Sequence, residues 1–176
     1  FMLAAVISRF GPPDVLEIRD VPTPAPGPDE VLVRVHASSL NRADLAQRLG
    51  RYPAPPGWPA DIPGLEFAGQ VAATGSDARR WHAGDRVFGL VGGGAHAEYV
   101  VVHEATIARI PDTLTWHEAA AIPEAFLTAY DAMITQGAMN SLNPVIRIRR
   151  QFADGLTSHD AAASKEECNA RLQTLL

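Results

Sequence analysis

The feature that most constrains the fold is a proline-rich segment that follows Gly50. Its prolines are Pro53, Pro55, Pro56, Pro59 and Pro63. Proline lacks a backbone N–H and fixes φ, so this segment forms neither an α-helix nor a central β-strand. Residues 41–49 before it carry a helical pattern with Asn41 as the N-cap, and Gly50 ends that pattern. A stiff loop between a helix and a strand is a frequent place for a binding cleft, and Tyr52 lies at its start.

Most of the first 110 residues carry the pattern of short β-strands. Residues 31–36 (VLVRVH) alternate apolar and polar side chains, as in a strand with one buried face. Similar segments recur between glycine and proline turns, and we expect strands over residues 2–8, 16–20, 31–36, 67–74, 84–89, 97–102 and 105–110. Many short strands with this punctuation are typical of a compact β-barrel or bent sandwich.

Helical patterns replace strand patterns after residue 114. Thr115 and Glu118 fit a capping box, Pro123 interrupts the pattern, and residues 124–134 resume it. Residues 143–156 and 164–176 each place their apolar side chains on one helical face. The expected fold class is therefore mainly β with α, a bent β-barrel followed by short helices and a C-terminal helical hairpin.

Composition limits the partners of the chain. A net charge of −5 over 176 residues gives no electrostatic reason to bind nucleic acid or an anionic membrane. The single cysteine, Cys168, forms no disulfide within the chain and no cysteine-based zinc site. No apolar run reaches the roughly 18 residues of a membrane span, and the N-terminus lacks a basic region followed by an apolar one. We expect a cytoplasmic protein with no nucleic-acid or membrane partner.

Five motifs occur in a fixed order along the chain. They read SSLNRADLAQRLGRYPAPPG (residues 38–57), IPGLEFAGQV (62–71), GDRVFGL (84–90), GGGAHAEYV (92–100) and EAAAIPEAFLTAYDAM (118–133). Together they resemble the N-terminal GroES-like domain of the medium-chain dehydrogenase superfamily. Within it they resemble the quinone oxidoreductase branch and its stress-inducible quinone reductase subgroup. The resemblance implies a GroES-like substrate-side domain over residues 1–136.

The resemblance also implies roles for four residues. Tyr52 would donate a proton or a hydrogen bond to the quinone oxygen as hydride arrives. Asn41, Arg42 and Thr128 would face the substrate and the nicotinamide. From the residues alone, other roles stay open: Tyr52 can pack its ring on the loop prolines, Asn41 can serve only as an N-cap, and Thr128 can bond its own helix backbone.

Neither a catalytic zinc nor a bound dinucleotide is expected. Zinc-dependent relatives carry Cys at the position of Ser39 and His at that of Leu65, and neither residue here is a ligand. Glu66 is then a hydrogen-bonded structural carboxylate. The three glycines 92–94 precede a strand rather than a helix, which favours a tight turn over a phosphate loop. The intact family uses NADPH, but no glycine fingerprint opens a helix after a strand here, so we expect no Rossmann domain and no cofactor.

The end of the chain resembles a different family. Residues 136–145 (QGAMNSLNPV) resemble the glutamine-loop region of peptide-importer ATP-binding subunits, and the residues after them resemble the start of their helical subdomain. The tripeptide QGA fits both families, so the chain resembles a chimera joined at residues 136–138. No phosphate-binding loop is present, and ATPase activity is not expected. Residues 137–176 would form a helical hairpin whose apolar face serves a homodimer.

Two functions remain open from the sequence. The first is a truncated, chimeric quinone oxidoreductase-like protein, a stand-alone folded module that lacks catalytic activity because it lacks the NADPH-binding domain. The second is an NADPH-dependent quinone oxidoreductase, of which this chain is the substrate-side part with a quinone-like small molecule as its ligand. Hydride transfer requires the nicotinamide to be held against the substrate, so NADPH binding separates the two hypotheses.

Overall fold

The computed structural model describes the backbone of residues 1–138 and the side chains of residues 1–132. A compact unit covers Phe1–Leu127, a second begins at Thr128, and each is considered by itself. The boundary expected after Gln136 falls near the end of helix α3 (Pro123–Ala138). The expected C-terminal hairpin and Cys168 lie outside the described residues.

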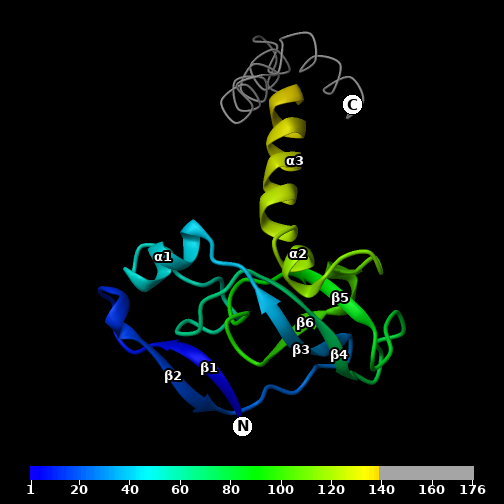
Figure 1. Ribbon diagram of the computed structural model, residues 1–176, viewed down its shortest axis with the longest axis horizontal. Coiled ribbons are helices and arrows are strands. Elements are labelled where there is room, and N and C mark those ends of the chain that lie inside the picture. The colour runs from blue at the N-terminus through cyan, green and yellow to red at the C-terminus, as the bar shows by residue number, and fades with distance from the viewer. Residues whose placement is uncertain (139–176) are drawn as a thin grey trace. The chain divides into compact units, whose positions relative to one another are not determined.

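The first unit is built mainly from antiparallel strands, which confirms the expected fold class (Figure 1). The strands are β1 (Met2–Ile7), β2 (Leu16–Val21), β3 (Glu30–Ser38), β4 (Glu66–Thr74), β5 (Arg86–Leu90), β6 (Tyr99–His103) and β7 (Ile107–Arg109). Strands β1 and β2 pair with each other, and the others form a five-stranded sheet in the order β6-β3-β4-β5-β7. The β1–β2 pair lies to one side of the larger sheet (Figure 1).

Local signals in the sequence define the helices. Helix α1 (Arg42–Arg48) has Asn41 as its N-cap, and helix α2 (Trp116–Ala120) begins after the expected capping box. In that box the Thr115 hydroxyl accepts a hydrogen bond from the Glu118 backbone N–H at 3.3 Å, and a Glu118 carboxylate oxygen accepts one from the Thr115 N–H at 2.9 Å. Helix α3 begins at Pro123, a position where the missing N–H of proline removes no helical hydrogen bond.

The main core lies along one face of the five-stranded sheet. Alternation in β3 buries Val31 and Val33 completely and leaves Arg34 exposed, as the VLVRVH pattern predicts. Phe67 on β4, also fully buried, packs with them. Fully burying a valine or phenylalanine side chain stabilises a fold by about 1.5–3 kcal/mol, so these few residues fix which face of the sheet is internal.

Trp116 holds helix α2 against the sheet. Its ring stacks on His36 with 4.4 Å between centroids and 12° between planes, and the guanidinium carbon of Arg86 lies 4.5 Å from its centroid. Arg86 also donates from Nη2 to the Leu114 carbonyl at 2.7 Å. Residues from β3 and β5 therefore both contact the indole, one through ring stacking and one through a cation–π interaction.

The proline-rich loop packs against the three glycines. A Cβ on Gly92 would lie 2.5 Å from the Trp58 ring, so only glycine lets the indole approach this backbone. Gly94 N–H donates to the Ile62 carbonyl at 2.8 Å, and its φ of +90° also favours glycine. The glycines therefore position the loop, and the backbone N–H of Gly94 is already occupied.

Among the described residues no helix is long and apolar enough to cross a membrane.

Candidate functional site

Glu66 links the start of helix α1 to the start of helix α3. Its side chain is buried, with 2% of the residue surface exposed. One carboxylate oxygen accepts from the side-chain amide of Asn41 at 2.9 Å, and the other accepts from the backbone N–H of Glu124 at 2.8 Å. The expected structural role of Glu66 is confirmed, and the Asn41 side chain is fixed in one orientation by it.

Asp44 is the second buried carboxylate of this region. Its oxygens accept from the backbone N–H of Asn41 at 2.7 Å and from that of Gly64 at 2.9 Å. Burial by itself raises the pKa of Asp44, but the interaction with His96 and the two backbone N–H groups outweigh it and lower the pKa below its ordinary value. Asp44 is therefore an anion that connects helix α1 to the end of the proline-rich loop.

Gly64 allows this connection. Its φ is +106°, and a Cβ there would lie 2.5 Å from the His96 backbone nitrogen. A side chain at this position would therefore both strain the backbone and push the 95–96 segment away. The conformation of Gly64 brings His96 next to Asp44, with 3.6 Å between His96 Nε2 and Asp44 Oδ2. On its other side, His96 Nδ1 lies 3.0 Å from the hydroxyl oxygen of Ser38.

The structure brings together only some of the residues that the sequence analysis selected. Asn41 caps α1 and contacts Glu66, and Arg42 is the exposed first residue of the same helix. Tyr52 lies in the loop after α1 and is 43% exposed. Thr128 is an exposed residue of α3 that belongs to the second unit. Its position relative to Asn41, Arg42 and Tyr52 therefore stays a prediction.

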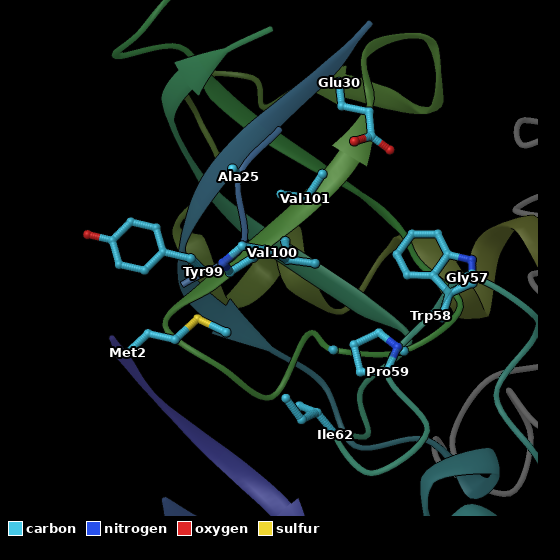
Figure 2. Close-up of a pocket in the computed structure, with 13 residues that line it drawn as sticks. Met2, Ala25, Glu30, Gly57, Trp58, Pro59, Ile62, Tyr99, Val100 and Val101 are labelled. Atoms are coloured by element: carbon cyan, nitrogen blue, oxygen red, sulfur yellow. The ribbon is translucent and has the colours of Figure 1, made fainter. Parts of the chain in front are cut away.

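Part of the proline-rich loop lines a concave cavity. Its volume is about 460 Å³, and Trp58, Pro59, Ile62, Tyr99 and Met2 are among the residues that line it. Figure 2 shows Tyr99 and Trp58 on opposite sides of this cavity. None of Asn41, Arg42 and Tyr52 lines it, so the cavity is separate from the site that the motifs indicated.

The described residues show neither a cluster of metal-ligand side chains nor a glycine loop that opens a helix. Within residues 1–132 no three His, Cys, Asp or Glu side chains converge as metal ligands. The Ser39 hydroxyl donates to the Ala120 carbonyl at 2.6 Å, and Asn41 rather than Ser39 contacts Glu66. The glycines 92–94 lead into strand β6 rather than a helix, so their backbone does not present a helix N-terminus to a pyrophosphate.

Sequence reasoning missed the row formed by Ser38, His96 and Asp44. Asp44 carried a weak signal, since a carboxylate three residues after the Asn41 N-cap predicts a capping box. His96 gave no signal, because a single histidine with no ligand spacing is indistinguishable from a surface histidine.

Comparisons with known proteins show which proteins this chain is similar to. Residues 27–112 match the family model of the alcohol dehydrogenase GroES-like domain. The quinone oxidoreductase of Homo sapiens is 34% identical over 148 residues, which are 82% of this chain and 44% of that protein. The quinone oxidoreductase of Pseudomonas aeruginosa is 44% identical over 116 residues, which are 65% of this chain and 35% of that protein.

Solved structures agree with the sequence matches. The quinone oxidoreductase of Coxiella burnetii superposes with a TM-score of 0.68 at 33% identity, over 76% of this chain and 44% of that one. The human synaptic vesicle membrane protein VAT-1 homolog-like protein superposes with a TM-score of 0.69 at 37% identity, over 73% of this chain and 41% of that one. The chain thus spans less than half the length of these relatives.

Proposed function

Because this chain contains a GroES-like domain of the type found in quinone oxidoreductases, we propose that its first unit is a substrate-side domain that binds a quinone-like small molecule. The observation that carries the proposal is the buried Glu66, which fixes the Asn41 side chain and the first turn of α3 in one arrangement. Preorganised polar groups beside an open loop are what a small-molecule site requires.

Three residues would act on the ligand. The Tyr52 side chain is partly exposed in the loop, and its hydroxyl would donate a hydrogen bond or a proton to a quinone oxygen. Arg42 is exposed one position after Asn41 and would stabilise negative charge on the reduced ligand. Asn41, already bound to Glu66 through its amide N–H, would present its remaining polar atoms beside Arg42.

The described residues provide no cradle for NADPH, so their part is limited to binding and protonating the quinone. In an intact oxidoreductase the hydride comes from a nicotinamide. We propose that the 176-residue chain by itself does not reduce quinones, and that it needs neither zinc nor another metal to fold or to bind its ligand.

The test uses the 176-residue chain with a simple ortho-quinone. Three tryptophans are present, and Trp58 lies in the same loop as Tyr52, so quinone binding should quench fluorescence in a saturable way. Tyr52→Phe should weaken binding by about 3- to 10-fold, the equivalent of one hydrogen bond. Tyr99→Phe, in the separate cavity, is the control and should change nothing.

The second assay mixes the chain, NADPH and the quinone and follows NADPH absorbance. No oxidation above the blank is expected. Saturable oxidation that Tyr52→Phe abolishes would refute the inactive-chain proposal, whereas absent quenching would refute the substrate-side assignment and favour a non-catalytic folded module.

A separate proposal concerns residues 137–176. Their resemblance to the helical subdomain of peptide-importer ATP-binding subunits supports a helical hairpin of different origin, joined to the quinone oxidoreductase-like part at residues 136–138. Phe126, Leu127 and Tyr130 are more than half exposed in helix α3, and such apolar surface favours burial against a further partner. We propose that the hairpin supplies this burial in a homodimer.

A further inference from the structure

Ser38, His96 and Asp44 form a polar row that runs from solvent to the protein interior. Ser38 is the exposed last residue of β3, and its hydroxyl oxygen lies 3.0 Å from His96 Nδ1. His96 Nε2 lies 3.6 Å from Asp44 Oδ2, with 13% and 5% of the two side chains exposed. A hydroxyl, an imidazole and a buried carboxylate in this order are the groups of a nucleophilic serine site.

The surroundings of the imidazole determine its proton arrangement. Asp44 is an anion, because two backbone N–H groups and His96 lower its pKa. His96 Nε2 is buried and has no hydrogen-bond partner within the described residues, so the Asp44 carboxylate is the group that attracts a proton on this atom. With the proton on Nε2, the Nδ1 lone pair accepts the Ser38 O–H. The contact of 3.6 Å is longer than a full hydrogen bond, as is common for catalytic groups before a ligand binds.

Ser38 and His96 open into a shallow groove of about 380 Å³. Its walls come from β1, β2, β3 and the 95–98 segment, and most of the side chains that line it are apolar. The alanines that line it are Ala4, Ala5, Ala37, Ala95 and Ala97. The Glu98 carboxylate at the groove is occupied by the Leu3 N–H at 2.8 Å. Such a groove fits a short acyl chain better than a charged or bulky ligand.

We propose that Ser38 is a nucleophile that accepts a short acyl group from an activated carboxylic ester. Its oxygen attacks the carbonyl carbon while His96 Nδ1 takes the hydroxyl proton. The bond to the alcohol then breaks, and the alcohol leaves with the proton from His96. Water repeats the sequence on the acyl-serine, with His96 as base, and releases the carboxylic acid. Asp44 positions His96 and does not touch the ester. This proposal does not rest on the proposed quinone site.

The experiment uses the 176-residue chain, a fluorophosphonate probe and 4-nitrophenyl acetate. The probe should form one covalent adduct, which peptide mass spectrometry should place on Ser38, and the ester should give a burst of nitrophenolate. Ser38→Ala should abolish both signals. Ser39→Ala is the matched control and should retain both, because the Ser39 hydroxyl donates to the Ala120 carbonyl outside the row.

Two further variants separate catalysis from folding. His96→Gln keeps a polar side chain but removes the base, and should slow acylation by roughly 100-fold while circular dichroism stays native. Asp44→Asn should lower kcat for the ester and leave KM unchanged. An adduct on another residue, no adduct in the native chain, or equal acylation rates in native and His96→Gln protein would each overturn the proposal.

Discussion

The contact between Asn41 and Glu66 leads to a prediction that can be worked out atom by atom. Asp and Asn are about equally good N-caps, so Asn41→Asp leaves the cap of α1 intact. It replaces the amide that donates to Glu66 at 2.9 Å with a second carboxylate. The lost hydrogen bond to a charged group corresponds to about 1.5–3 kcal/mol, and two like charges about 4 Å apart repel by up to about 4 kcal/mol at an effective dielectric of 20.

Protonation relieves part of this repulsion. Two facing carboxylates share a proton, which raises the pKa of the pair. The folded state of Asn41→Asp then binds more protons than the unfolded state, so its deficit relative to the native sequence shrinks as the pH falls. We expect a loss of about 2–4 kcal/mol at pH 7 and a smaller loss at about pH 5.

A second substitution should restore the stability of the first. In Asn41→Asp with Glu66→Gln, the glutamine oxygen accepts from the Glu124 N–H and its NH2 donates to the new carboxylate. The double variant should therefore be at least about 1.5 kcal/mol more stable than the sum of the single changes predicts. Urea unfolding followed by tryptophan fluorescence measures all four proteins. Additivity within about 0.5 kcal/mol would refute the contact.

Three other predictions test neighbouring features. The pKa of Asp44 is lowered in the fold, so its contribution to stability is complete above its unfolded pKa of about 3.9 and is lost as the pH falls through its folded pKa. Urea midpoints measured between pH 6 and pH 2 should therefore fall less steeply in Asp44→Asn than in the native chain. Equal pH dependence of the two urea midpoints would contradict this. Gly64→Ala should lose roughly 2–4 kcal/mol, because its Cβ would meet His96. Gly57→Ala is the control, at a φ of +91° with no atom within 4 Å of the added Cβ, and should lose only about 1 kcal/mol. Equal thermal midpoints of Gly64→Ala and Gly57→Ala would refute the clash with His96. Truncation after Ile134 should lower both the thermal midpoint and the mass measured by light scattering; if neither changes, the tail is not a structural interface.

Local sequence signals predicted much of the fold. Alternation in VLVRVH gave strand β3, and the capping-box pattern at Thr115 gave the start of α2, because both signals depend on residues a few positions apart. The start of α3 was less accurate, since Pro123 looked like an interruption but is the first helical residue. Proline is common at the first position of a helix and also just after the end of a preceding helix. Pro123 by itself therefore does not show whether a helix ends or begins there.

Long-range contacts account for what the sequence did not reveal. Ser38 and His96 are 58 residues apart. Backbone hydrogen bonds that join the 95–98 segment to Gly64, to β1 and to Val35 of β3 bring them together. The same holds for Glu66, whose second partner is a backbone N–H at the start of α3. The composition of the 41–66 segment indicated a site, but the groups that fix its geometry come from distant parts of the chain.

The unpaired sheet edges affect how the protein behaves at high concentration. Edge strands present free N–H and C=O groups that can recruit a strand from another molecule. Strand β7 offers only three residues at its end of the sheet. Strand β2 exposes Ile18 at 72%, but Glu17, Arg19 and Asp20 surround it, and Arg19 pairs with Glu17 at 2.7 Å. A second copy that added a strand to β2 would have to desolvate these charges, so short length protects β7 and charge protects β2 from β-pairing with another molecule.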